Sequence, residues 1–131
     1  LMNKNIETRP LSPHLTIHKK VLTSLLSIVH RLTGLGLSLG SVLIVVWIFS
    51  IAMGEEYFNI VYFFLGSILG KTILFFWSFG TFYHLINGVR YLIWSMGYGI
   101  ELNNIYRSGY LVIFLSIIFT ILLWVIVLDI I

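Results

Sequence analysis

Three long apolar stretches constrain this chain more than any other feature of its sequence. The first runs without a charged residue from Leu32 to Gly54. The second runs from Tyr57 to Val89, where Lys71 and His84 are the only basic side chains and no acidic one occurs. The third runs from Gly109 to Leu128. About 20 consecutive apolar residues suffice for a helix that crosses the hydrocarbon core of a bilayer.

The composition agrees with membrane insertion. Hydrophobic residues make up 59% of the 131 residues, charged residues make up 10%, and the mean hydropathy is +1.01. A soluble protein of this length could not bury so much apolar surface, so the surplus must face lipid. We therefore predict an all-α membrane protein that forms a single domain over residues 1–131.

The predicted organisation is an N-terminal interfacial arm followed by three transmembrane helices. The arm covers residues 1–20, where Pro10 and Pro13 prevent a regular helix. The expected bounds of the helices are about residues 21–53, 60–94 and 109–129.

The second apolar region is too long for one perpendicular span and too short for two. We place its membrane-crossing part at about Gly66 to Trp94, preceded by an aromatic lead-in that suits the interface.

Charge and cysteine content narrow the possible functions. The net charge of +3 is gathered at helix ends, which is typical of membrane topology and argues against a nucleic-acid partner. By the positive-inside rule, the N-terminus lies on the cytoplasmic or matrix side. The chain has no cysteine, so a metal within it must be held by histidine.

One face of the first helix carries small and polar residues. At 100° per residue these side chains lie within about 60° of one line. They are Ser27, His30, Arg31, Gly34, Ser38 and Ser41. Such a stripe is either a packing seam between helices or the wall of a binding site. An arginine near the inner edge of a membrane can also act only as a topology anchor.

His84 is the sharper signal, because intramembrane histidine is rare and is usually functional. It lies about six residues, or roughly 9 Å, from the edge marked by Arg90. Gly80 and Gly88 stand one turn on either side of it, which leaves room for a flat macrocycle bound by the imidazole. The alternative is a histidine hydrogen-bonded to a neighbouring helix, with both glycines serving packing.

His30 is a less suitable second ligand for the same iron. Counted from the helix ends, it lies near the inner edge while His84 lies several ångströms deeper. We therefore expect a partner subunit to supply the second axial ligand. His30 and Arg31 are better placed to meet haem propionates, since the guanidinium offers a fork of donors that matches a carboxylate.

Three segments resemble a known family. They are Arg9–Ile17 (RPLSPHLTI), Ser27–Gly34 (SIVHRLTG) and His84–Trp94 (HLINGVRYLIW). The second and third match the signatures S-x-x-H-R-x-[ST]-G and H-x-x-x-G-[hydrophobic]-R. On these motifs the chain resembles the cytochrome b subunits of succinate dehydrogenase, respiratory complex II.

The resemblance implies roles for individual residues. His84 would be the axial ligand of haem b, and His30 and Arg31 would lie at its propionates. Ser27, Ile28 and Arg31 would line the ubiquinone pocket. The residues expected to pack against the haem are Gly34, Ser38, Gly80 and Gly88.

The resemblance also implies an assembly. A second small membrane-anchor subunit would share the haem, completing a heterodimeric helical anchor, and an iron–sulfur subunit and a flavoprotein subunit would dock on the inner face. Electrons from succinate would reach ubiquinone in a bacterial or mitochondrial inner membrane, and the chain would have no catalytic activity alone. The alternatives are the anchor of a quinol:fumarate reductase and a membrane scaffold without a redox role.

Overall fold

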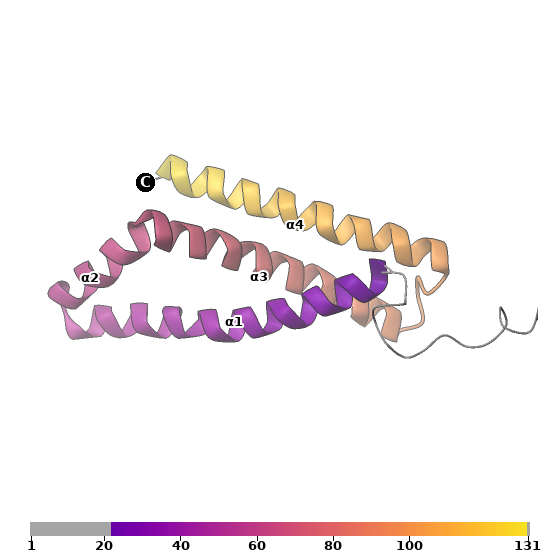
Figure 1. Cartoon of the computed structure of the whole chain (residues 1–131), viewed down its shortest axis with the longest axis horizontal. Coiled ribbons are helices and arrows are strands. Elements are labelled where there is room, and N and C mark those ends of the chain that lie inside the picture. The colour runs from indigo at the N-terminus through magenta and orange to yellow at the C-terminus, as the bar shows by residue number, and fades with distance from the viewer. Residues whose placement is uncertain (1–21, 131) are drawn as a thin grey trace, which may run out of the picture.

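The computed structural model describes residues 22–130, and all the regular secondary structure of this part of the chain is helical. Its elements are α1 (Leu22–Met53), α2 (Glu55–Gly66), α3 (Ile68–Ser95) and α4 (Leu102–Ile130). The three long helices run along the long axis of the molecule, and α2 crosses obliquely from the end of α1 to the start of α3 (Figure 1). The all-α prediction is confirmed. The expected arm lies outside the described residues.

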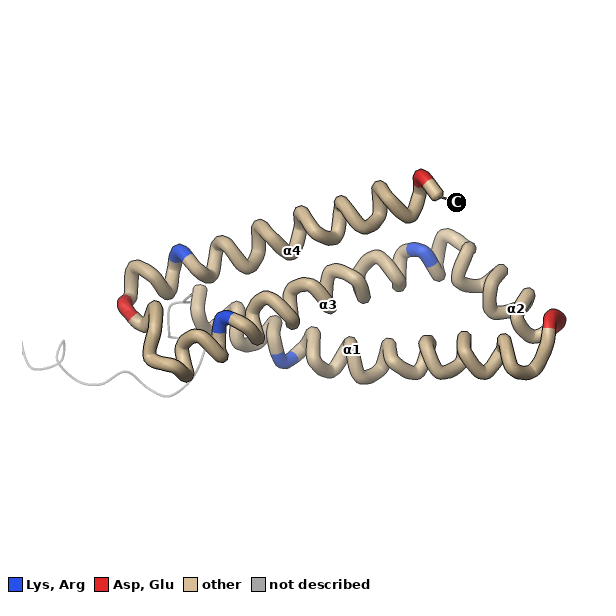
Figure 2. The backbone as a smooth tube through the Cα atoms, turned by 180° about the vertical axis from the view of Figure 1, so that it is seen from behind, with Lys and Arg blue, Asp and Glu red and all other residues tan. Residues whose placement is uncertain are grey.

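The number of membrane spans depends on how α2 and α3 are counted. α1 and α4 are each long and apolar enough to cross a bilayer, and α2 with α3 makes a third span if the bent pair is one crossing. Charged residues lie toward the two ends of the bundle, and the middle of each long helix is free of them (Figure 2). The described helices therefore suit a membrane, and the count of three spans stays a prediction.

A sharp bend separates α2 from α3, where we expected one helix from about residue 60. The axes differ by 73° at Ser67, which has an extended backbone. The hydroxyl of Ser67 accepts a hydrogen bond from the Gly70 amide at 3.1 Å, so Ser67 caps the new helix. A Cβ atom on Gly70 would collide with the Phe64 carbonyl oxygen and would lie 2.7 Å from that of Leu65. Glycine at position 70 thus permits the close approach that the bend requires.

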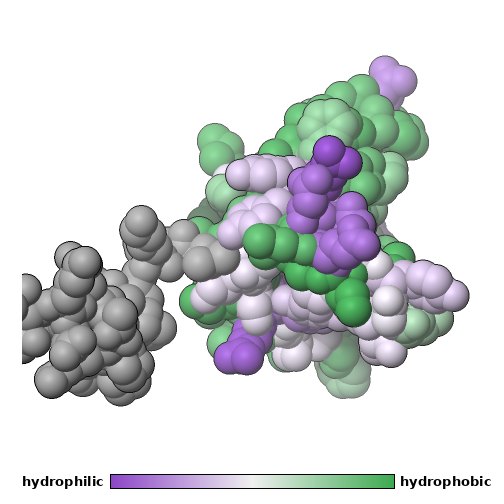
Figure 3. Space-filling view, turned by 90° about the vertical axis from the view of Figure 1, so that its right-hand side faces the viewer, coloured by the Kyte–Doolittle hydropathy of each residue, from purple (hydrophilic) through white to green (hydrophobic). Residues whose placement is uncertain are grey.

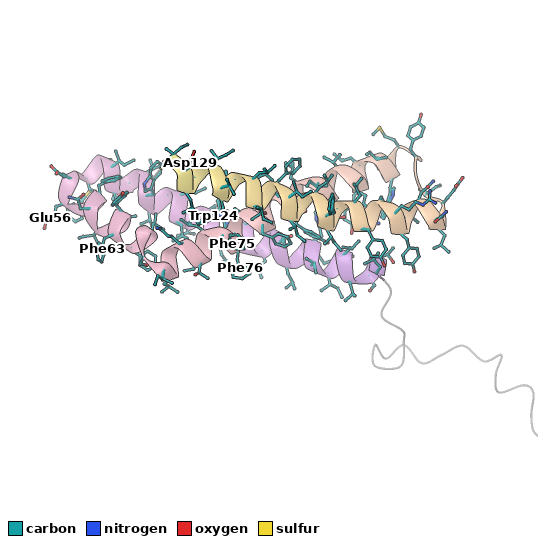
Figure 4. The ribbon with its side chains drawn as sticks, turned by 90° about the horizontal axis from the view of Figure 1, so that it is seen from above. Glu56, Phe63, Phe75, Phe76, Trp124 and Asp129 are labelled. Carbon is teal, nitrogen blue, oxygen red and sulfur yellow. The ribbon has the colours of Figure 1, made fainter. Side chains whose placement is uncertain are left out.

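Small polar residues line the seam between α3 and α4. Ser78, Ser116 and Thr120 are buried, and each donates its hydroxyl proton to a carbonyl of its own helix. The Trp124 indole of α4 donates to Ser78 Oγ at 2.9 Å and lies beside Phe75 of α3 (Figure 4). Small residues allow membrane helices to approach closely, and the helix carbonyls accept from the hydroxyls, so no water is needed.

Arg90 ties the C-terminal part of α3 to the first turns of α4. Its guanidinium is buried and donates to Ser108 Oγ at 2.8 Å, to the Ile105 carbonyl at 2.8 Å and to Asn87 Oδ1 at 3.1 Å. The face of Trp94 lies 4.0 Å from it, within cation–π range. α4 begins at Leu102 rather than near Gly109, so it has the extra turns that these contacts use.

The small core lies at the same end, which we call the Arg90 end of the bundle: the end where α1 begins, α3 ends and α4 begins. It consists of Leu26, Tyr83 and Val112, one residue from each long helix. The Tyr83 hydroxyl donates to the Leu26 carbonyl at 2.7 Å. Seen from this end, hydrophilic surface is gathered on the tip, and apolar surface continues behind it (Figure 3).

The bend can be tested with the two glycines on either side of it. We expect Gly70→Ala to destabilise the protein by about 1–3 kcal/mol, because its Cβ meets backbone atoms that cannot move independently. Gly66→Ala is the matched control, since no atom lies within 4 Å of its added Cβ. The measurement is the thermal unfolding midpoint of the detergent-solubilised protein, and equal midpoints for both variants would contradict the packing described.

Candidate functional site

His84 of α3 is held against α1 by hydrogen bonds to its Nδ1 atom. This nitrogen lies 3.2 Å from the carbonyl oxygen of His30 and 3.2 Å from Oγ1 of Thr33. The Thr33 hydroxyl donates its own proton to the same carbonyl at 2.9 Å. With the hydroxyl donating in this way, both neighbours are acceptors toward Nδ1, which suits the tautomer with the proton on Nδ1. In that tautomer the lone pair is on Nε2, the arrangement found in metal-binding histidines.

The rings of His30 and His84 are stacked on each other, so the two side chains lie closer together than the expected depth offset suggested. Their centroids are 4.0 Å apart, and the ring planes differ by 5°. The expectation took Arg90 as the membrane edge, whereas the structure shows Arg90 buried and bonded to the Ile105 carbonyl of α4. A nitrogen lone pair lies in the plane of its ring, so two rings stacked face to face do not point at one iron.

Three glycines border the contact between α1 and α3: Gly34 from the polar stripe of α1, and Gly80 and Gly88 from the His84 face of α3. A Cβ on Gly34 would lie 3.1 Å from Cε1 of His84, and one on Gly88 would lie 3.9 Å from Cε1 of His30. A Cβ on Gly80 would lie 3.8 Å from the methyl group of Thr33. These contacts favour close helix packing as one role of the three residues. Their packing against a haem stays a prediction.

The rest of the α1 stripe does not face α3 as one surface. Ser38 is exposed and donates to the Gly34 carbonyl at 3.0 Å. Arg31 and Ile28 are exposed, and Ser27 is half-buried. The structure thus brings His30 and Gly34 to His84 and leaves Ile28 and Arg31 on the outside of the described chain. Their roles at a quinone stay predictions.

An apolar groove runs along α1 and α3 beside this contact. It encloses about 610 Å³ and includes Thr33 and Gly80, so one end adjoins the neighbours of His84. Trp77 also lines it and packs on Gly40, where a Cβ would collide with the indole. Ser27, Ile28 and Arg31 do not line this groove.

These features fit a haem better than a metal ion held by several side chains. Residues 22–130 contain no group of three His, Cys, Asp or Glu side chains that could bind such an ion. A haem iron needs only one axial nitrogen from this chain, and His84 Nε2 offers it. Buried His30 Nδ1 and Trp77 Nε1 also have no hydrogen-bond partner within this part of the molecule.

Two residues at the site were not assigned a role from the sequence. Thr33 is the [ST] position of the first signature and lies three residues after His30, and this spacing is the available clue that it could reach the same carbonyl. Arg90 closes the second signature, but its contacts with α4 have no local sequence signal.

Comparison with known proteins identifies the family. The profile described as succinate dehydrogenase/fumarate reductase transmembrane subunit matches residues 5–123. The chain is 37% identical over 131 residues to the succinate dehydrogenase cytochrome b560 subunit of Reclinomonas americana, an alignment covering 96% of this chain and 90% of the relative.

Two further relatives agree. The cytochrome b556 subunit of Rickettsia bellii is 42% identical over 117 residues, covering 89% of this chain and 91% of the relative. The human mitochondrial cytochrome b560 subunit is 39% identical over 123 residues, covering 88% of this chain and 70% of the relative. The resemblance seen in the motifs is confirmed, and the chain belongs to the succinate dehydrogenase/fumarate reductase transmembrane subunit family.

Proposed function

We propose that this chain is the cytochrome b membrane anchor of a succinate dehydrogenase, and that it binds haem b and forms part of a ubiquinone-reduction site. The observation that carries the proposal is His84, a histidine within an apolar helix whose Nδ1 is hydrogen-bonded to α1, so that Nε2 is available to bind a metal. The names of the relatives include both cytochrome b and succinate dehydrogenase.

The haem, when bound, supplies one-electron transfer. His84 would be its axial ligand from this chain, and the bond from Nδ1–H to the His30 carbonyl would make Nε2 a stronger donor. The groove beside His84 would keep water from the macrocycle, since its lining is mainly Leu, Ile, Phe and Gly. His30 and Arg31 would meet the propionates.

The quinone site would lie on the first turns of α1. Ser27 and Arg31 are one helical turn apart, so a hydroxyl and a guanidinium are available on one face, and Ile28 adds apolar contact. The quinone oxygens gain negative charge during reduction. Donors at these oxygens therefore stabilise the reacting state more than the bound quinone, and they raise turnover as well as affinity.

Other subunits would complete both sites. Arg31 and Ile28 are exposed in the described chain, and most apolar side chains of α1 face outward. This supports a second small anchor subunit that supplies the other haem ligand, together with iron–sulfur and flavoprotein subunits at the Arg90 end.

The proposed location is a bacterial or mitochondrial inner membrane, with the N-terminus on the cytoplasmic or matrix side. The family also includes fumarate reductase anchors, and the succinate dehydrogenase names of the relatives favour succinate oxidation.

Replacement of His84 tests the haem assignment. We expect His84→Ala to shift or abolish the b-type band in the reduced-minus-oxidised spectrum of the purified complex, because the ligand nitrogen is lost. Exogenous imidazole should restore part of the band in His84→Gly. A wild-type spectrum and midpoint potential in His84→Ala would show that another residue binds the iron, and complete lack of a b-type band in the wild-type complex would favour a scaffold.

Replacement of Ser27 and Arg31 tests the quinone assignment. We expect Ser27→Ala and Arg31→Leu to lower succinate:quinone activity at least tenfold, the effect of losing about 1.4 kcal/mol of transition-state stabilisation. Succinate oxidation by an artificial acceptor at the flavoprotein should be almost unchanged. Arg107→Leu is the matched control, since Arg107 is also an exposed cation at the Arg90 end. Parallel loss of both activities in Arg31→Leu would instead support the topology-anchor interpretation.

A further inference from the structure

We propose that Thr33 is a positioning residue that fixes both the tautomer and the orientation of His84. The inference rests on the proposed role of His84 as a haem ligand and adds a residue of α1 to the site. Its basis is the three-membered hydrogen-bonded group of His84 Nδ1, Thr33 Oγ1 and the His30 carbonyl, whose separations are 3.2, 3.2 and 2.9 Å.

The direction of each bond follows from the chemistry of the three groups. A carbonyl oxygen can only accept, so in the 2.9 Å bond between Thr33 and His30 the hydroxyl is the donor. The threonine oxygen then faces Nδ1 with a lone pair, and the carbonyl faces it with another. With Nδ1 deprotonated, the Thr33 hydroxyl is the one donor among the three groups, and it can bond either the carbonyl or Nδ1 but not both. With Nδ1 protonated, the hydroxyl bonds the carbonyl and Nδ1–H makes a second hydrogen bond. The Nδ1–H tautomer is therefore favoured, and the lone pair is confined to Nε2.

The acceptors are rigid, so they also fix the direction of the ring. The His30 carbonyl belongs to the helical backbone of α1, and Thr33 is β-branched, with its side chain locked by the bond to that carbonyl. On the edge of the ring, Gly34 leaves only enough room for Cε1, since a Cβ there would lie at 3.1 Å. On its face, the ring of His30 stacks at 4.0 Å. Together these contacts from residues 30, 33 and 34 hold the imidazole in one orientation.

The contacts of Nδ1 also affect how tightly His84 would bind a metal. A hydrogen bond from the distal N–H of a ligating imidazole makes the other nitrogen more basic, and its loss costs roughly 10–100-fold in metal affinity. Without the threonine oxygen, the His30 carbonyl remains as a single acceptor, and the ring can turn more freely. The iron would be held less tightly, and the weaker donor would favour the reduced form.

The experiment compares Thr33→Val with Thr33→Ser in the assembled, detergent-solubilised complex. Valine keeps the branched shape and removes the hydroxyl, and serine keeps the hydroxyl. Thr81→Val is the matched control, because the Thr81 hydroxyl bonds the Trp77 carbonyl of its own helix at 2.9 Å. The readouts are the rate of haem transfer to excess apomyoglobin and the haem midpoint potential, and neither depends on activity.

We expect Thr33→Val to release haem roughly tenfold faster, the low end of the range for such contacts, with a more positive midpoint potential. Thr33→Ser and Thr81→Val should match the wild-type complex. If Thr33→Val released haem at the wild-type rate, or if serine and valine had equal effects, the hydroxyl would not position His84 and the inference would be overturned.

A second variant covers the case in which Thr33→Val does not assemble. Thr33→Ala removes the hydroxyl and adds no bulk, so it should also release haem faster than Thr33→Ser, and equal rates for these two variants would overturn the inference. His84→Ala separates this outcome from failure of the proposed function. If His84→Ala retained a wild-type haem spectrum, the ligand assignment would fall. If only His84→Ala altered the haem, the assignment would stand and the role of Thr33 would fall.

Discussion

Hydrocarbon offers no hydrogen-bond partner, so a polar group inside a membrane helix must find its partner within the protein. The serines and threonines of α3 and α4 meet this requirement locally, by bonding carbonyls of their own helices. Arg90 meets it by reaching across to α4, and His84 by reaching across to α1. The same requirement that stabilises the bundle thus selects which nitrogen of His84 remains free.

Much of this architecture could be predicted because it depends on local patterns. Apolar stretches of 20 or more residues predict membrane helices wherever they occur, and in the described chain those stretches are helical except at Gly54 and at the break at Ser67. Helical periodicity placed Gly80 and Gly88 on the face of His84, and that face is the one that meets α1. His84 itself could be selected because an intramembrane histidine is rare.

What could not be predicted depends on contacts between distant segments. The break at Ser67 requires the end of α2 to lie against Gly70, which periodicity does not show. Sequence could not show that α4 covers Arg90, or that the ring of His30 stacks on the ring of His84. Thr33 looked like an ordinary helix residue until its neighbours on α3 were known.

One peptide group lies at the centre of this account. The His30 carbonyl oxygen, which is hydrogen-bonded to His84, belongs to the peptide group between His30 and Arg31. Arg31 is the residue proposed to bind both a haem propionate and the quinone. The most direct test is a high-resolution cryo-electron microscopy map of the assembled complex. The account predicts continuous density between His84 Nε2 and a haem iron, with Nδ1 within hydrogen-bonding distance of Thr33 and of the His30 carbonyl. An iron bound by another residue of this chain, or a His84 ring turned away from α1, would contradict it.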